Sequence, residues 1–375
     1  MTSILSLFSS CLPCFPFVSG SYIKINGVTY SIIRLLGEGG FSYVYLVNQI
    51  NSSSSGQPSP YALKQINCLF GTEDESFRNA TREIKNYHRF LNYKTPYIIQ
   101  SIEEQIISNP DGSIRINILL PYFTTSLQEI INENVLNNTK LDEKDILKYF
   151  IGICRGLKIM HNYKQTTRNV GNLDNDEDLD DDIEEQDTLL NPPDDEFDVE
   201  SNANTAGGAR SNTELQELIP FAHHDLKPAN VMLSAEGLPV LVDLGSCSKA
   251  RYNIRTRQQA LSLTDFAQEH CTLPYRAPEL LDVETGSQIT EATDIWSLGC
   301  LLYCCCFGYS PFEKLEIDQG ANLNLAIAQG KYQIPEDQNG YSDELVGLIR
   351  KSLQVKAKNR PKVEELLEEA LKIGN

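Results

Sequence analysis

Short apolar runs rich in β-forming residues dominate the first third of the chain. They lie at residues 28–36, 45–47, 61–66 and 116–123. Runs of this length, separated by polar and glycine-containing turns, predict a β-sheet. Asn26-Gly27 stands between alternating apolar residues and predicts a tight hairpin, so we expect the folded domain to begin near Ser21.

Helical patterns follow in three later stretches. Residues 77–91 are helix-like and carry several basic side chains. Residues 256–270 predict a helix from the spacing of their apolar positions, Ala260, Leu261, Leu263, Phe266 and Ala267. The apolar run at residues 295–307 is shorter than the ~18 residues that span a bilayer, so we expect a buried helix with free thiols.

Composition and charge place these elements in one domain with an inserted segment. The 375 residues are 41% apolar, enough for the core of a single two-lobed domain, and the net charge is −19. Fifteen acidic residues lie between Asp174 and Glu200, so the remainder carries a formal charge of only −4. We expect residues 164–216 to be a disordered acidic insertion, either inert or a docking and phosphorylation segment containing Thr188 and Ser201. We expect no nucleic-acid partner. The ten cysteines lack zinc-like spacing, which indicates a reducing, cytosolic environment.

Candidate chemistry concentrates in one string, His-His-Asp-Leu-Lys-Pro-Ala-Asn at residues 223–230, followed by Asp243-Leu244-Gly245. This order of acid, cation, amide and second acid is typical of phosphoryl transfer from a magnesium nucleotide. Asp225 can accept a hydroxyl proton, and Lys227 can neutralise the moving phosphoryl group. Asn230 and Asp243 can hold Mg²⁺ against the phosphates.

A second group of residues upstream could bind the nucleotide. The glycine-rich turn at residues 37–44 predicts backbone N–H groups that approach phosphate oxygens, although a simple hairpin turn is the alternative. Lys64 lies on a strand and could meet phosphate charge, and Glu83 could pair with it; either could also be merely solvated. The candidate nucleotide-binding residues in this part of the chain are Gly37, Gly39, Gly40, Val44, Ala62, Lys64, Glu83, Leu120, Tyr122 and Phe123. Ala62 and Leu120 could equally be ordinary core residues.

Further motifs appear downstream, namely Ala277-Pro278-Glu279, Asp294 before Ile295-Trp296, and Arg360. With these, the chain resembles the eukaryotic protein kinases over residues 22–373. Within them it is similar to the Numb-associated kinases, in their myristoylated and palmitoylated branch, where the fungal vacuolar member is nearest. Residues 37–44, 152–157, 239–246 and 257–263 carry this closer likeness.

The resemblance implies an α+β bilobal kinase fold, with a small antiparallel β lobe containing one helix and a larger, mainly helical lobe. The expected boundaries are 1–20 for a membrane-anchoring tail and 21–375 for the kinase domain, with the small lobe at 21–120, the hinge at 121–124 and the large lobe at 125–375. ATP and Mg²⁺ are the implied cofactors. Protein serine and threonine hydroxyls are the implied substrates, since Pro228 follows Lys227. The resemblance also implies a Glu279–Arg360 pair, a tether from Asp294 to the loop around Asp225, and a helix in the activation segment.

The first twenty residues contain no charged side chain. A signal peptide would need a basic start, Pro13 and Pro16 would break a spanning helix, and Thr2 excludes ordinary myristoylation. S-acylation of Cys11 and Cys14 is the remaining membrane hypothesis, and a disordered apolar tail is the alternative. The resemblance implies the cytosolic face of the vacuole or another endomembrane, alternatively the Golgi.

His224 departs from the kinase pattern, which usually places arginine there to bind a phosphorylated activation segment. Histidine is mostly neutral at pH 7. We therefore hypothesise that activity does not depend strongly on activation-segment phosphorylation. Thr272 is either a hydrogen-bond partner of Asp225 or a phosphorylation site.

Two rival functions remain, a membrane-tethered pseudokinase scaffold and a lipid or small-molecule phosphotransferase. Retention of Lys64, Glu83, Asp225, Asn230 and Asp243 disfavours the first, and the downstream motifs disfavour the second.

Overall fold

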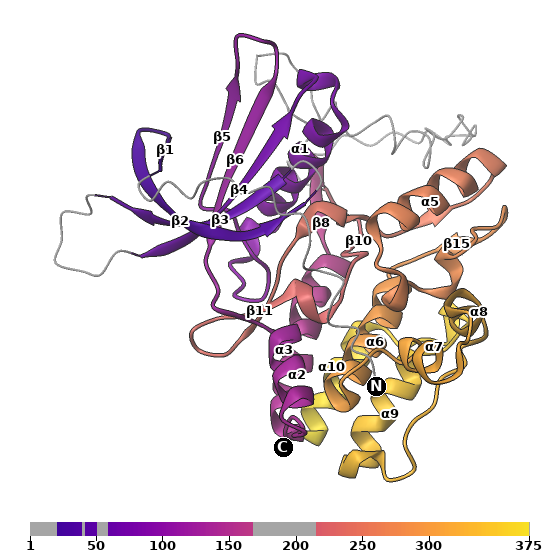
Figure 1. Ribbon diagram of the computed structural model, residues 1–375. Coiled ribbons are helices and arrows are strands. Elements are labelled where there is room, and N and C mark those ends of the chain that lie inside the picture. Colours follow the sequence, from indigo (N-terminus) through magenta and orange to yellow (C-terminus); the bar gives the residue numbers. More distant parts are fainter. Residues whose placement is uncertain (1–20, 40–41, 51–58, 168–214, 375) are drawn as a thin grey trace, which may run out of the picture. The chain divides into compact units, whose positions relative to one another are not determined.

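The computed structural model describes residues 21–39, 42–50, 59–167 and 215–374, and the chain forms two compact units. Of the described residues, those up to Phe77 and Ile102–Tyr122 form unit 1, and Arg78–Ser101 with those from Phe123 onward form unit 2. Figure 1 shows strands in the first and mainly helices in the second. The predicted α+β class, an antiparallel sheet unit and a helical unit, is confirmed.

Unit 1 is built on one six-stranded antiparallel sheet in the order β1-β2-β3-β4-β6-β5. The strands are β1 (Tyr22–Ile25), β2 (Val28–Glu38), β3 (Ser42–Gln49), β4 (Pro60–Cys68), β5 (Glu103–Ser108) and β6 (Ile114–Pro121). The predicted hairpin at Asn26-Gly27 is confirmed, and both residues have positive φ (45° and 89°), as a tight turn requires. A core of Ile25, Tyr30, Val47, Leu63 and Leu119 is buried in this unit.

One face of this sheet carries the core of Ile25, Tyr30, Val47, Leu63 and Leu119, and the other carries candidate site residues, because side chains alternate along a strand. Leu63 on β4 lies opposite Leu119 on β6, and both are core residues. Their neighbours Lys64 and Leu120 therefore point to the other face.

Unit 2 is mainly helical. Its helices are α2 (Leu127–Leu136), α3 (Glu143–His161), α5 (Arg257–His270), α6 (Ala292–Phe307), α7 (Glu313–Gln319), α8 (Leu323–Gln329), α9 (Asp343–Ser352) and α10 (Val363–Ile373). Residues Thr293–Cys306 of α6 are all buried, which confirms the predicted buried helix, and its cysteines are free thiols. Trp296 on α6 stacks on Phe312 at 5.5 Å. Among the helices that the structure describes, none is long and apolar enough to cross a bilayer.

Short strands of unit 2 carry the candidate site. They are β7 (Thr125–Ser126), β10 (Phe221–Ala222), β11 (Val231–Leu233), β12 (Pro239–Leu241), β13 (Ser248–Lys249), β14 (Tyr252–Asn253) and β15 (Gln288–Ile289). Gly152 on α3 lets that helix lie against β12, since a Cβ there would overlap the Pro239 ring. This close packing fixes the strand that leads into Asp243.

Helix α1 (Glu75–Arg89) crosses the division between the units, and its residues from Arg78 onward group with unit 2. The small lobe expected at residues 21–120 includes this whole helix, and that boundary stays a prediction. Within unit 2, the side-chain amide of Asn86 donates to the carbonyl oxygens of Leu244 and Cys247 at 2.9 and 2.8 Å.

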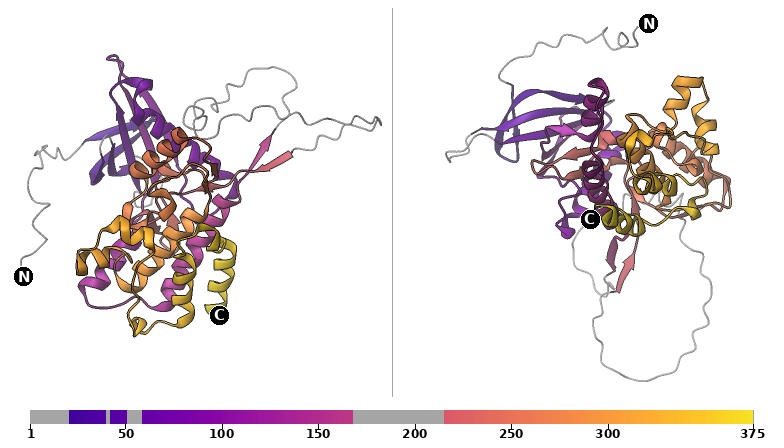
Figure 2. Two further views of the ribbon diagram at one scale, coloured as in Figure 1. Left: turned by 90° about the vertical axis from the view of Figure 1, so that its right-hand side faces the viewer. Right: turned by 90° about the horizontal axis from the view of Figure 1, so that it is seen from below.

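The predicted insertion begins and ends in a two-stranded ribbon. β8 (Lys164–Thr167) pairs with β9 (Leu215–Leu218), and the ribbon stands out from the rest of unit 2 (Figure 2). The ends of the 164–216 range are therefore paired strands, and the acidic residues between them lie outside the described residues.

Candidate active site

The carboxylate of Asp225 is the centre of the candidate site in unit 2. It lies in the loop between β10 and the 3₁₀ helix η5 (Pro228–Asn230), and Asp225 is 8% exposed. Lys227 Nζ and Asn230 Nδ2 donate to Oδ2 at 2.7 and 3.0 Å. Thr272 donates to Oδ1 from its backbone nitrogen at 2.9 Å and from its hydroxyl at 2.6 Å. Three of the residues that the sequence singled out therefore converge on the carboxylate of the fourth.

These hydrogen bonds decide the charge of Asp225. Burial would raise the pKa of the carboxyl, but the hydrogen bonds from Lys227 and Thr272 outweigh burial and hold the pKa below its ordinary value. Asp225 is therefore an anion near neutral pH. It is placed to accept a hydrogen bond from an incoming hydroxyl.

Asn230 and Asp243 are connected through the backbone. The carbonyl oxygen of Asn230 accepts from the backbone nitrogen of Val242 at 3.0 Å, and Asp243 is the next residue. The Asn230 side chain donates through Nδ2 to the backbone and carboxylate oxygens of Asp225, which leaves its Oδ1 as the atom able to bind a metal. Asp243 has φ 60° and ψ 70°, a left-handed conformation that aspartate tolerates better than most residues.

An amide oxygen and a carboxylate are ligands that suit Mg²⁺, which typically binds one or two protein groups and completes its shell with water and phosphate. The described part of the chain contains no cluster of three or more His, Cys, Asp and Glu that could hold a metal alone. The residues therefore fit a magnesium ion that binds together with a phosphate-bearing substrate.

Glu83 on α1 lies near Asp243. A Cβ built on Gly245 would lie 3.5 Å from Asp243 Oδ1 and 3.7 Å from Glu83 Oε2. Tyr87, one turn further along α1, donates its hydroxyl to Glu83 Oε1 at 2.6 Å. Helix α1 thus places Glu83 beside the segment that contains Asp243, a second candidate residue.

Unit 1 brings together the nucleotide candidates of the sheet. Val44 on β3 lies opposite Gly37 on β2 and opposite Lys64 on β4. Two residues from Lys64, Ala62 pairs with Leu120 on β6. Residues directly opposite on neighbouring strands share a face, so these side chains lie on the sheet face opposite to Leu63 and Leu119.

The turn after β2 is closed by hydrogen bonds between Gly39 and Ser42, with Gly39 N 2.8 Å from Ser42 O. Gly40 lies outside the described residues. Tyr122 and Phe123 are half-buried at the change from unit 1 to unit 2. The predicted pair of Lys64 and Glu83 would join the two units and stays a prediction.

Asp294 on α6 holds the loop that carries Asp225 through hydrogen bonds to its backbone. Its carboxylate accepts the backbone N–H groups of His223 and His224 at 2.8 and 3.0 Å and the His161 ring nitrogen at 3.0 Å. Burial would raise the pKa of Asp294, and the hydrogen bond from His161 outweighs it, so the pKa lies below its ordinary value. The loop is therefore held by a buried anion.

His224 is buried next to this tether, and its backbone is left-handed at φ 64°. Its ring packs edge-to-face on Phe266 of α5, with centroids 5.5 Å apart. Both ring nitrogens are buried. Burial lowers the pKa of His224 to about 4, so the ring is neutral at physiological pH.

The predicted helix at residues 256–270 is confirmed as α5, which begins with a capping box between Thr256 and Gln259. It is followed by the 3₁₀ helices η7 (Leu273–Tyr275) and η8 (Pro278–Leu280). Arg276 donates to the carbonyl oxygens of Cys271 and Gln268 through Nη2 at 2.6 and 3.4 Å, at the last turn of α5. Cys271 immediately precedes Thr272, so Arg276 fixes the residue that holds Asp225.

The expected ion pair between Glu279 and Arg360 is present. Arg360 Nη1 and Nη2 donate to the two carboxylate oxygens of Glu279 at 2.6 and 2.7 Å. Arg360 also lies over the Trp296 ring at 5.1 Å. This pair ties η8 to the C-terminal end of unit 2.

The sequence did not single out His161, Arg276 or Phe266 as partners in the site. His161 meets Asp294 across 133 positions, and no local pattern indicates such a contact. The sequence pattern identifies Phe266 only as one of the apolar positions of a helix. Cys11 and Cys14, the proposed acylation sites, lie outside the described residues.

Comparison with known proteins agrees with this geometry. The protein kinase domain family matches residues 219–371. The chain is 38% identical over 371 residues to serine/threonine-protein kinase ENV7 of Saccharomyces cerevisiae, with 97% of each chain covered. It is 34% identical over 358 residues to serine/threonine-protein kinase ppk13 of Schizosaccharomyces pombe, with 94% of each covered. Serine/threonine-protein kinase 16 of Homo sapiens is 32% identical over 346 residues, which cover 92% of this chain and 90% of the relative.

Proposed function

The chain belongs to the eukaryotic protein kinase family, as a serine/threonine protein kinase, and we propose that Asp225 is the residue through which it transfers the γ-phosphate of ATP to protein hydroxyls. The observation that carries this proposal is the Asp225 carboxylate, which accepts hydrogen bonds from Lys227, Asn230 and Thr272 and whose pKa is held below its ordinary value by those from Lys227 and Thr272. A scaffold without activity would not need an oriented anion.

In this proposal the substrate hydroxyl donates a hydrogen bond to Asp225. Its oxygen bonds to the γ-phosphorus as the bond to the β-phosphate oxygen breaks, and the hydroxyl proton leaves toward the Asp225 carboxylate. Lys227, which is 2.7 Å from Asp225 Oδ2, is placed to offset the negative charge of the phosphoryl group in transit. The low pKa of Asp225 makes it a weak base, so its contribution is orientation of the hydroxyl and late acceptance of the proton.

Protein kinases use ATP with Mg²⁺, which neutralises phosphate charge when it is bound. Here Asn230 Oδ1 and the Asp243 carboxylate would hold the ion. Lys64, with Gly37, Gly39 and Val44 of the same sheet, would bind the phosphates, and Ala62 and Leu120 would contact the purine. Tyr122 and Phe123 would provide the hinge next to it.

We also propose that activity is independent of phosphate on the activation segment. His224 is neutral and packs on Phe266, so α5 is docked by an aromatic contact where other kinases use an arginine–phosphate pair. Phosphatase treatment of the purified protein should leave kcat within about twofold. A loss of tenfold or more would contradict this proposal.

The cellular setting is a proposal from the sequence. We propose that acylated Cys11 and Cys14 anchor the protein to the cytosolic face of the vacuole or a related membrane, where it acts in fusion or trafficking. The double variant Cys11→Ser, Cys14→Ser should move to the cytosol, with Cys68→Ser as the control for loss of a thiol elsewhere. Continued sedimentation of the double variant with membranes would contradict the anchor.

The transfer reaction itself is tested with labelled ATP. The wild-type protein should incorporate acid-stable label into serine and threonine of itself or of a generic protein substrate, and Asp225→Asn should not. Asp265→Asn, which removes an exposed carboxylate from α5, is the matched control. Equal labelling of the wild type and Asp225→Asn would favour the scaffold.

A further inference from the structure

The side chain of Asn86 joins α1 to the turn that follows Asp243. Asn86 is only 1% exposed, and its amide nitrogen donates to the carbonyl oxygens of Leu244 and Cys247 at 2.9 and 2.8 Å. These two residues are the first residue and the C-cap of the 3₁₀ helix η6 (Leu244–Ser246), and Asp243 is its N-cap. Asn86 therefore holds both ends of the turn that begins directly after Asp243.

The turn needs such support because of the backbone of Asp243. Its φ of 60° and ψ of 70° form a left-handed conformation, which a residue other than glycine keeps where its surroundings fix it. The backbone hydrogen bond that closes η6 is 3.2 Å long. Ser246 Oγ donates to the carbonyl oxygen of His223 at 2.7 Å and ties the turn to the neighbouring loop. The two bonds from Asn86 tie the same turn to α1.

Arg89 sets the orientation of the Asn86 amide. Arg89 Nε donates to Asn86 Oδ1 at 3.4 Å, so the amide nitrogen is the atom that faces the two carbonyl oxygens. A reversed amide would set its oxygen against those carbonyls, which accept but cannot donate. The Arg89 guanidinium is itself placed over two rings, 4.1 Å from the centroid of Phe221 and 5.5 Å from that of Tyr163. Arg89 thus links the amide to β10, the strand that leads into the Asp225 loop.

We propose that Asn86 is a positioning residue that fixes the Asp243 carboxylate for the metal ion, and that Arg89 acts through Asn86. The inference rests on the proposed function, in which Asp243 binds Mg²⁺, and it adds what keeps that carboxylate in place. All of these contacts lie within unit 2, so they would hold Asp243 independently of the nucleotide-binding sheet of unit 1.

The test measures metal binding directly, with Mn²⁺ as the probe and its EPR signal as the readout. Asn86→Leu keeps the approximate volume of the side chain and removes its donors. In the presence of a non-hydrolysable ATP analogue, this variant should bind Mn²⁺ about tenfold more weakly, the order expected from the loss of two buried hydrogen bonds. Amide hydrogen exchange over residues 243–247 should also become faster, because the turn is released from α1.

Arg89→Met tests whether Arg89 acts through Asn86. It should weaken Mn²⁺ binding by about threefold, since one orienting hydrogen bond is lost. The double variant should bind Mn²⁺ no more weakly than Asn86→Leu alone, because residues that act on one path are not additive. If Asn86→Leu did not fold, Arg89→Met would still decide the question, because it leaves Asn86 in place.

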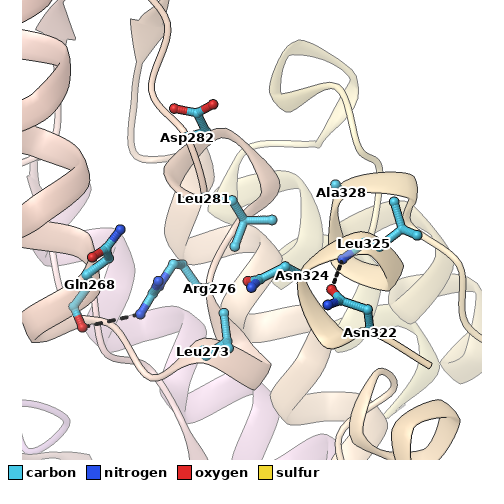
Figure 3. Close-up of a pocket in the computed structure, with 9 residues that line it drawn as sticks. All are labelled: Gln268, Leu273, Arg276, Leu281, Asp282, Asn322, Asn324, Leu325 and Ala328. Atoms are coloured by element: carbon cyan, nitrogen blue, oxygen red, sulfur yellow. Dashed lines mark hydrogen bonds between the residues drawn. The ribbon is translucent and has the colours of Figure 1, made fainter. Parts of the chain in front are cut away.

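Two controls change side chains that make none of these contacts. His88→Asn alters an exposed position of α1 between Asn86 and Arg89. Leu325→Ala alters a residue of α8 that lines a separate pocket, none of whose lining side chains takes part in the contacts of Asn86 (Figure 3). Both variants should bind Mn²⁺ as the wild type does.

The proposal would be overturned if Asn86→Leu bound Mn²⁺ as tightly as the wild type, or if the effects of the two single variants added in the double variant. A lower unfolding temperature with unchanged Mn²⁺ affinity would also overturn it, because Asn86 would then have a structural role alone. Absence of nucleotide-dependent Mn²⁺ binding by the wild type would overturn the proposed metal site at Asp243. Hydrogen exchange over residues 243–247 would then still show whether Asn86 holds the turn, and an unchanged rate would overturn that as well.

Discussion

Thr272 binds Asp225 twice, through its backbone nitrogen and its hydroxyl, and both donate to the same carboxylate oxygen. The hydroxyl bond is the shorter, at 2.6 Å, and Lys227 Nζ lies 2.7 Å from the same hydroxyl oxygen. The segment that follows α5 and the loop that carries Asp225 are thereby joined through the hydroxyl oxygen of Thr272. A change at Thr272 should act directly on the proposed catalytic anion.

Thr272→Ala should lower kcat by roughly tenfold or more, because it removes a charge-assisted hydrogen bond that orients Asp225. Thr272→Ser keeps the hydroxyl and should remain within about threefold of wild type. The KM for ATP should be unchanged in both, which steady-state kinetics would show. Thr272→Glu should be nearly inactive, since it places a second carboxylate beside Asp225, so phosphorylation at Thr272 would inhibit. An active Thr272→Glu variant would contradict this role for the hydroxyl.

His224 should make the stability of the fold depend on pH. Its pKa falls from about 6.5 in the unfolded chain to about 4 in the folded protein, so the unfolded chain binds more protons between these values. The free energy of unfolding should therefore fall as the pH drops from 6.5 to 4, with a contribution of roughly 3 kcal/mol from this ring.

His224→Asn isolates that contribution, because asparagine tolerates the left-handed backbone at this position and does not titrate. The variant should lose most of the pH dependence between 6.5 and 4 in denaturant titrations. His88→Asn, at an exposed position on α1, should keep it. An unchanged slope for His224→Asn would show that other titrating groups carry the pH dependence.

Arg276 should support activity through α5. Arg276→Met removes the donors to the carbonyls of Cys271 and Gln268 and should cost roughly 2 kcal/mol of stability. Because Cys271 precedes Thr272, kcat should fall while the KM for ATP changes little. Arg257→Met, in the exposed first turn of the same helix, should change neither quantity. Arg276→Lys should restore part of the loss, and a normal kcat for Arg276→Met would contradict the positioning role.

Breaking the Glu279–Arg360 ion pair should lower the free energy of unfolding more than breaking an exposed ion pair. The Arg360 side chain is fully buried, so Glu279→Gln leaves a buried charge without its partner and should destabilise the fold by about 3–5 kcal/mol. Lys351→Met breaks an exposed pair with Glu369, 2.7 Å apart, and should cost less than about 1 kcal/mol. Chemical denaturation measures both, and similar costs for the two variants would contradict the assignment.

The extent to which the sequence predicts the site depends on distance along the chain. Asp225, Lys227 and Asn230 lie within six residues, so their spacing alone predicts that they meet, and the hydrogen bonds among them confirm it. The strands that carry Val44 and Lys64 are recognisable from composition, and their register follows from the turns and the alternation of buried positions.

The pattern of apolar and polar positions in the sequence does not predict contacts that depend on tertiary packing. Apolar spacing predicts α5, but it does not reveal that Leu261 is 49% exposed while Phe266 meets His224. His161 and Arg276 look like ordinary polar residues in their own segments. Folding brings His161 to Asp294 and turns the Arg276 guanidinium toward the Cys271 carbonyl oxygen at the end of α5.

The most direct test of the central claim is the kcat for peptide phosphorylation by the wild-type protein and by Asp225→Asn, at saturating ATP and Mg²⁺. If Asp225 orients and accepts the proton of the substrate hydroxyl, its replacement by an isosteric amide should lower kcat by at least about a hundredfold, with the thermal stability little changed. A kcat for Asp225→Asn equal to that of the wild type would show that Asp225 does not carry the transfer.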